Sequence, residues 1–293
     1  TADAPFWEAL HAAAQASEPQ VRDAMLATIR QLRAAIDLDQ VEAMINAALG
    51  ADWASGRIMQ AMGLERIIYD TLSGLAPEWE RIAVAVGESS ASTLEAELAI
   101  AEINMDAFFQ RVPALTRLHS GTLITNVTTQ QLETIRAVLA ENWERTPAQL
   151  ARALKDVVGL DRKQAPALER YRLELERKKL PKKKIQAMVI AERKRMVNIR
   201  ANRIGRTEPV SMANEAQLEL WKVEKESGNL SGIDLTKKFV GLAGELLYPP
   251  AHQNCLCTVQ IILLQDGRFA RRWIRVPAQQ PCAICDSYEG QVI

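Results

Sequence analysis

Residues 21–36 read VRDAMLATIRQLRAAI, and this stretch sets the expected fold of the N-terminal part of the chain. Its apolar side chains recur every three or four residues and line one face of a helix: Val21, Met25, Ile29, Leu32 and Ile36. Residues 6–16 and 41–49 show the same spacing. We therefore expect residues 1–110 to form successive helices, with Pro19 near the start of the second, where its missing N–H does no harm.

Two further helix starts carry capping signals. Thr128 and Thr146 are each followed three residues later by a glutamine, and Pro147 stands at the first helical position of the second segment. This spacing lets the threonine and the glutamine cap each other's backbone N–H groups. With Gly159 as a helix stop, the sequence predicts a helical hairpin over 128–160. Such hairpins can read DNA, but the second helix carries few cations, so we expect a packing role.

The charge of the chain is balanced in total and segregated along its length. It has 293 residues with 36 basic and 36 acidic side chains. Residues 1–160 carry 12 basic and 21 acidic side chains, residues 161–206 carry 16 and 5, and residues 207–293 carry 8 and 10. The zero total argues against a uniformly basic nucleic-acid binder and against an acidic solvating tail. No apolar run reaches the ~18 residues of a membrane span.

Residues 161–206 form a basic block that Pro181 interrupts. Apolar side chains at helical spacing alternate with the cations after the proline, so we expect an amphipathic helix with a cationic outer face. A solvated surface is one explanation of this face. Contact with the phosphate backbone of a nucleic acid, without sequence reading, is the other. The cations expected to face nucleic acid are Lys178, Lys179, Lys182, Lys183, Lys184, Arg193, Lys194 and Arg195.

The last part of the chain changes character. Prolines, β-branched residues and short apolar runs at 258–264 and 272–276 predict a small α+β domain. The expected fold class is therefore mainly α, with long helices in the N-terminal two-thirds and a small α+β C-terminal domain stapled by a cysteine cluster. We expect a helical docking region over 1–115, the hairpin and the basic helix over 116–206, and the α+β domain over 207–293.

All four cysteines fall in the last 39 residues, as a C-x-C and a C-x-x-C pair. Clustering of this kind predicts one local site. Four thiolates, or three with an imidazole, could close a tetrahedral zinc site that holds together a domain with little apolar area to bury. Two disulfides, core cysteines without metal and a redox C-x-x-C are the alternatives. The expected ligands of one structural zinc ion are Cys255, Cys257, Cys282 and Cys285, with His252 as an alternative ligand.

Four motifs between residues 115 and 293 share a likeness. Residues 248–257 read YPPAHQNCLC, and residues 203–208 read RIGRTE with Asn214 and Trp221 following. The third motif consists of Arg272-Trp273, C-A-I-C at 282–285 and Glu289-Gly290. The fourth is the sequence LITN, which precedes the expected hairpin. Together they resemble the P-P-x-H-P-x-C-R-C, I-A-R-T-E, tryptophan, C-P-x-C and D-G elements of the Mu-F-like phage head-morphogenesis (minor head protein) family. The likeness covers residues 115–293. The residues matching the family's helix motif are Arg206, Thr207, Glu208 and Asn214.

Two features depart from the family pattern. Gln253 and Leu256 stand where the family has Pro and Arg. The C-x-x-C pair follows the C-x-C pair, whereas in the family it precedes it. Moving 268–292 to between Gly232 and Ile233 restores the family order. Our hypothesis is that either the numbering of this tail departs from the biological chain or the gene is permuted. The zinc prediction holds in both cases because ligands need proximity in space, not order.

The resemblance implies a virion structural protein, a minor head (minor capsid) component at the portal vertex that acts in phage head assembly and DNA packaging or delivery. The implied partners are the portal protein, the scaffold or major capsid protein, and packaged DNA through backbone contacts, with no membrane. The implied location is the virion, in the head interior or at the portal vertex, and the host cytoplasm during assembly. A zinc-stapled nucleic-acid-binding regulator is the alternative.

An enzyme is not expected. The chain has three histidines: His11, His119 and His252. It has no Gly-rich phosphate loop, no G-x-S-x-G and no H-E-x-x-H. Glu208 could serve as a catalytic carboxylate, but an ion pair within its helix, with Arg203 or Arg206, is the simpler account of this residue.

Overall fold

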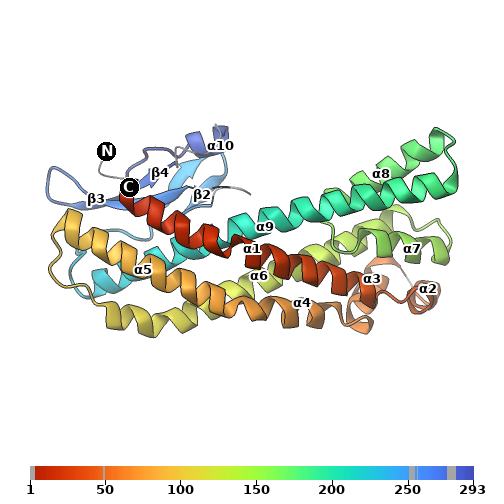
Figure 1. The fold of residues 1–293 in the computed structure, drawn as a ribbon, viewed down its shortest axis with the longest axis horizontal. Coiled ribbons are helices and arrows are strands. Elements are labelled where there is room, and N and C mark those ends of the chain that lie inside the picture. The colour runs from red at the N-terminus through yellow and green to blue at the C-terminus, as the bar shows by residue number, and fades with distance from the viewer. Residues whose placement is uncertain (1–3, 49, 251–254, 256, 276–281) are drawn as a thin grey trace. The chain divides into compact units, whose positions relative to one another are not determined.

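Long helices dominate the computed structural model, which describes residues 4–48, 50–250, 255, 257–275 and 282–293 (Figure 1). The helices are α1 Ala4–Ala35, α2 Leu38–Asn46, α3 Ala51–Ala61, α4 Leu64–Leu72, α5 Ala76–Leu98, α6 Met105–Glu141, α7 Pro147–Val157, α8 Gln164–Arg177 and α9 Lys182–Glu226, with a 3-10 turn, η1, at Ser73–Leu75. The C-terminal part adds β1 Phe239–Gly241, β2 Gly244–Leu246, β3 Thr258–Leu263, β4 Phe269–Ile274 and the short helix α10 Ala283–Asp286. The expected fold class is confirmed: mainly α, with a small α+β C-terminal part that carries a cysteine cluster.

The chain divides into two compact units, each built from separate stretches of sequence. Unit 1 comprises Thr1–Val21, Leu75–Ser120 and Arg203–Ile293, and unit 2 comprises Arg22–Gly74 and Gly121–Asn202. Helices α1, α6 and α9 each contribute residues to both units. The boundaries expected after residues 115 and 206 fall inside α6 and α9, and the three-part division by composition and charge stays a prediction. Among the described residues, no helix combines the length and the apolar character that a membrane span requires.

Pro19 does not separate two helices, so the expected break before residue 21 is wrong. Helix α1 continues from Ala4 to Ala35 with Pro19 inside it. The apolar stripe keeps its phase across the proline, with Leu10 and Ala14 buried before it and Val21 and Met25 buried after it. The alanine-rich sequence around this point also favours a helix. Burial along one continuous face thus offsets the backbone hydrogen bond that the proline cannot make.

One of the two predicted capping boxes is present. At the start of α7, Thr146 Oγ1 accepts a hydrogen bond from the Gln149 backbone N–H (3.4 Å), and Gln149 Oε1 accepts one from the Thr146 N–H (3.1 Å). The prediction for Thr128 is wrong, because Thr128 lies inside α6. The buried face of α6 runs through this point from Val127 to Ile135, and extending a helix costs less than starting another.

The end of α7 is fixed by Gly159, as the sequence predicts. Gly159 has a φ of +89°, and a Cβ there would lie 2.4 Å from Cγ2 of Ile29. Its N–H donates to Gln131 Oε1 (2.9 Å), and its carbonyl accepts from Nη1 of the buried Arg200 (2.9 Å). This backbone position therefore needs glycine both for its conformation and for its packing within unit 2.

The C-terminal part of unit 1 contains two antiparallel hairpins, β1–β2 and β3–β4. Asp266 and Gly267 form the turn of the second hairpin: Asp266 Oδ1 accepts a hydrogen bond from the Arg268 N–H (3.1 Å), and Gly267 has a φ of +80°. Asp-Gly is typical of tight hairpin turns. The bond between residues 267 and 268, which a restored family order would break, lies in this turn.

Candidate metal centre

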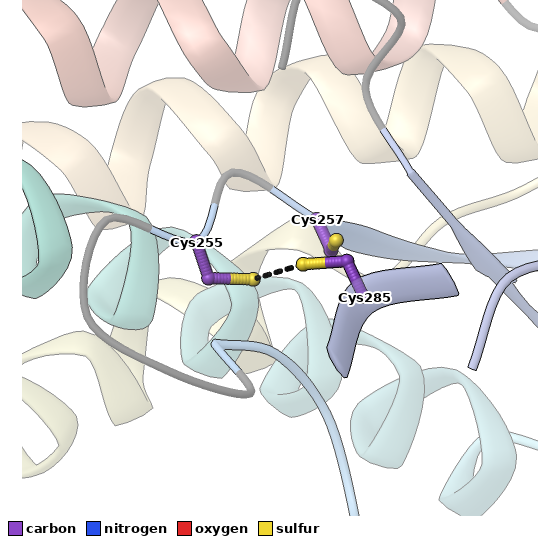
Figure 2. A group of neighbouring side chains, drawn as sticks. All are labelled: Cys255, Cys257 and Cys285. Carbon is purple, nitrogen blue, oxygen red and sulfur yellow. Dashed lines mark hydrogen bonds between the residues drawn. The ribbon is translucent and has the colours of Figure 1, made fainter. Parts of the chain in front are cut away.

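Three cysteine sulfurs converge in the C-terminal part of unit 1 (Figure 2). Cys255 and Cys257 precede β3, and Cys285 comes from α10. All three residues are buried, and their Sγ atoms lie within 4.8 Å of one another. The Sγ atoms of Cys255 and Cys285 are 3.8 Å apart, which excludes a disulfide between them in this structure because an S–S bond is about 2.05 Å long. The three side chains form a group that could hold a metal ion.

Cys282 lies one turn before Cys285, at the position that caps α10. It is half-buried, and its backbone carbonyl accepts a hydrogen bond from the Asp286 N–H (2.8 Å). The charge of its thiolate is among the causes that raise the pKa of Cys285, so Cys282 belongs to the neighbourhood of the group. The alternative ligand, His252, lies outside the described residues.

The electrostatics of the group disfavour thiolates without a cation. The hydrogen bond with Cys255, burial and the charges of Cys255 and Cys285 together raise the pKa of Cys257 far above its usual value. Burial, followed by the charge of Cys255, raises the pKa of Cys285 to about 12. A metal ion supplies the positive charge that lets such thiols lose their protons. Metal binding at this group would therefore release protons and would strengthen as the pH rises.

A buried asparagine on α9 holds the segment that carries the first two cysteines. Asn214 Oδ1 accepts a hydrogen bond from Thr258 Oγ1 (3.0 Å), and Asn214 Nδ2 donates to the Val210 carbonyl (2.8 Å) and, at 3.4 Å, to the Cys257 carbonyl. Asn214 and Thr258 are 2% and 0% exposed. The asparagine of the family motif thus positions the start of β3, directly after Cys257. The sequence alone identified Asn214 by the resemblance and not by this role.

Aromatic packing holds α10 against the β3–β4 hairpin. The rings of Trp273 and Tyr288 stack with centroids 4.7 Å apart, and Phe239 meets Trp273 edge-on at 5.3 Å. The Tyr288 hydroxyl donates to the Gly244 carbonyl (2.8 Å). Arg271, which is fully buried, donates to the Leu247 carbonyl (3.0 Å). These contacts bring the C-x-x-C segment, distant in sequence, to the C-x-C segment.

The expected nucleic-acid-facing cations lie in unit 2, five of them around the turn between α8 and α9 and three about three turns further along α9. Seven of them are exposed: Lys178, Lys179, Lys182, Lys183, Lys184, Lys194 and Arg195. Arg195 pairs with Glu192 (2.5 Å). Pro181 separates α8 from α9, as the sequence predicts.

Arg193 is the exception among these cations. Its guanidinium donates to the carbonyls of Asp156 (2.7 Å) and Val158 (2.8 Å) at the end of α7. Burial, and then the positive charge of Arg33, lowers the pKa of Arg193 to about 10. Because this side chain is bound to carbonyls of unit 2, we correct its assignment from a nucleic-acid-facing residue to a helix-capping one.

Lys182, Lys183 and Lys184 occupy the first turn of α9, which contains no acidic residue. The N-terminus of a helix carries a partial positive charge, so each lysine there is disfavoured by about 0.3–1 kcal/mol at low ionic strength. The same end of the helix attracts anions. An anion bound at the first turn of α9 would therefore stabilise the helix and its three exposed lysines.

The four family-motif residues occupy one stretch of α9 but different environments. Arg206 is exposed, Thr207 and Glu208 are half-buried, and Asn214 is buried against Thr258. Glu208 faces His119 of α6, at 3.7 Å between Oε2 and Nε2, and not the arginines of its own helix that the sequence suggested. Comparison of the chain with protein-family models, with curated proteins and with solved structures finds no match.

Proposed function

We propose that this chain is a virion structural protein, a minor head component of the Mu-F-like kind that acts at the portal vertex in phage head assembly and DNA packaging or delivery. The observation that carries the proposal is the meeting of motif segments far apart in sequence. Asn214 of the helix motif bonds Thr258 beside the C-x-C pair, and Cys285 of the C-x-x-C pair joins that pair in one buried group. A set of matches that arose by chance would have no reason to pack together.

In this proposal the cysteine group holds one structural zinc ion. Two thiolates bound to a tetrahedral zinc at about 2.3 Å lie about 3.8 Å apart, and the Sγ atoms of Cys255 and Cys285 are 3.8 Å apart. Cys257 supplies the third ligand. Cys282 or His252 supplies the fourth. A closed site of this type contributes folding energy to a small domain and performs no reaction.

The turn between α8 and α9 is the proposed contact with packaged DNA. Its lysines are exposed, and three of them sit where the helix dipole disfavours a cation. A phosphate group at this helix end would remove that penalty and accept hydrogen bonds from the lysines. Residues 178–184 contain five lysines and no aromatic residue, which is the composition expected for backbone contact without base reading.

The experiment that tests this function is the composition of assembled particles. Heads produced from the genome that encodes the chain should contain it, and dissociation of those heads should release it together with the portal ring. Deleting its gene should yield heads that are absent, misassembled or unable to deliver DNA. Absence of the chain from purified heads, together with strong sequence preference in gel-shift assays, would overturn the proposal in favour of a nucleic-acid-binding regulator.

A further inference from the structure

A second cluster of titratable side chains lies in unit 1, outside the cysteine group. His119 of α6 meets Glu208 and Glu215 of α9. The histidine is 3% exposed, and the side chains of Glu208 and Glu215 are 25% and 19% exposed. Two helices distant in sequence thus bring one imidazole and two carboxylates together in a position that solvent reaches from the carboxylate side.

One ring nitrogen of His119 is committed to Glu215, since Nδ1 lies 2.9 Å from Glu215 Oε2. The other oxygen, Oε1, accepts from Ser211 Oγ (3.2 Å), and the Tyr248 hydroxyl also donates to this carboxylate. Burial, then the charge of Glu215, raises the pKa of Tyr248, so the phenol keeps its proton. Trp79 meets the imidazole edge-on, with ring centroids 4.7 Å apart. The carboxylate therefore fixes a ring that is protonated on Nδ1.

The other ring nitrogen, Nε2, is buried and has no hydrogen-bond partner among the described residues. The nearest carboxylate atom is Glu208 Oε2 at 3.7 Å, which is too far for a hydrogen bond. Two ligand atoms that each lie about 2.1 Å from one divalent ion are roughly 3.4–3.6 Å apart at angles of about 109–120°. The 3.7 Å between Nε2 of His119 and Oε2 of Glu208 is close to the separation of two ligands of one ion.

The negative charges of Glu208 and Glu215 also favour binding of a cation. Among the described ion pairs, neither Glu208 nor Glu215 has a lysine or arginine partner, and His119 is the group that both face. Burial raises the pKa of Glu208; the charge of His119 opposes this and that of Glu215 adds to it. When the imidazole gives up its second proton, the two carboxylates leave net negative charge in a region of low solvation, and a divalent ion bound at Nε2 would neutralise it.

We propose that His119 and Glu208 are the protein ligands of a second divalent-cation site, in which Glu215 is the positioning residue. The arrangement is the carboxylate–histidine–metal order found at many metal centres, where the outer carboxylate sets the tautomer and the aim of the ring. One imidazole and one carboxylate suit a cation of intermediate hardness such as Zn²⁺ or Co²⁺. The site links α6 to α9 and does not depend on the phage-head function or on the cysteine group.

The chain has only three histidines, so NMR of full-length protein labelled with ¹⁵N-histidine gives a direct test. Zn²⁺ is added beyond the amount that the cysteine group takes up. The Nε2 resonance of His119, assigned by its loss in His119→Gln, should move to a metal-bound position while Nδ1 stays protonated. Binding should tighten as the pH rises, because the ion competes with a proton for Nε2.

Two further variants test the proposal even if His119→Gln fails to fold. Glu208→Gln should weaken the zinc-dependent shift of His119 at least about tenfold, and Glu215→Gln should weaken it by about 10- to 100-fold through loss of ring orientation. Glu219→Gln, one turn further along α9, is the matched control and should bind zinc as the wild type does. Histidine resonances that do not respond to millimolar Zn²⁺, or equal responses in wild type and Glu208→Gln, would overturn the proposal.

Discussion

Asn214 of α9 accepts a 3.0 Å hydrogen bond from the hydroxyl of Thr258, the first residue of β3. This bond ties the longest helix of the described chain to the segment that carries Cys255 and Cys257. Asn214 therefore positions the segment that carries these two thiols, and its side chain is occupied by bonds within the protein.

The first prediction concerns this hydrogen bond. Asn214→Ala should lower the free energy of unfolding by about 1–3 kcal/mol, because it leaves the buried Thr258 hydroxyl without its best acceptor. It should also weaken metal binding, since the Cys257 carbonyl no longer accepts a hydrogen bond from α9. Thermal unfolding and a zinc competition assay measure the two effects. Asn198→Ala, at an exposed position of the same helix, is the control; equal behaviour of the two variants would contradict the positioning role.

The second prediction concerns the basic turn. Lys182→Glu/Lys183→Glu/Lys184→Glu should reduce binding to duplex DNA and lower the slope of log affinity against log salt by up to about 2.7, roughly 0.9 for each phosphate that the protein no longer neutralises. The fold should be retained, because glutamates in a first turn favour the helix dipole. Filter binding at several salt concentrations measures the slope. Reversing Lys225, Lys237 and Lys238, exposed lysines of unit 1, changes the charge equally; the same weakening from both triples would argue against a local interaction with DNA.

The third prediction uses two glycines of unit 2. Gly159→Ala should destabilise the protein by about 2–4 kcal/mol, because the added Cβ meets Ile29 and the φ of +89° strains any other residue. Gly121→Ala, in the middle of α6 with nothing within 4 Å of the new Cβ, should stabilise it by about 0.5–1 kcal/mol. Denaturant unfolding gives both values. A tolerated alanine at 159 would show that α7 ends differently.

The fourth prediction is a pH dependence in the presence of a chelator. Burial opposes the charged form of His119, but the hydrogen bond and charge of Glu215 and the charge of Glu208 outweigh it and raise its pKa. A raised pKa stabilises the folded state below the unfolded pKa of about 6.5, and this stabilisation is lost as the pH rises through the folded pKa. The wild type should therefore lose its advantage in unfolding free energy over His119→Gln as the pH rises above about 6.5. An advantage that does not change with pH would show that His119 keeps its ordinary pKa.

Local patterns predicted much of the fold. The spacing of Val21, Met25, Ile29, Leu32 and Ile36 marked a face that is fully buried. Thr146 and Gly159 marked the two ends of α7. These predictions hold because the interactions involved lie within a few residues of one another.

Other features depend on contacts that no local pattern contains. Thr128 has the spacing of a cap yet lies inside α6, since burial on both sides of it decides between two locally similar outcomes. The N-cap of α2, Asp37, accepts hydrogen bonds from the N–H groups of Asp39 and Gln40; an aspartate before the apolar stripe was the available signal. The meeting of His119 with Glu215, 96 positions apart, has no signal in a single sequence.

The cysteine cluster was predicted in part from the sequence and depends in part on tertiary contacts. Its clustering in the last 39 residues pointed to one site, and the structure brings Cys255, Cys257 and Cys285 together. The sequence does not show which cysteines meet in space. That depends on the β3–β4 hairpin and on the stacking of Trp273 on Tyr288, which are tertiary contacts.

The central claim is that a metal ion closes the cysteine group and holds the C-terminal part of unit 1 together. Native mass spectrometry of the full-length protein, purified without chelator and desalted, tests it most directly. We predict a mass that exceeds the chain by one zinc ion, and loss of that ion, with a lowered unfolding temperature, in Cys255→Ser and Cys285→Ser. A fully folded protein that has the mass of the chain alone and unfolds at the same temperature with and without zinc would contradict the account.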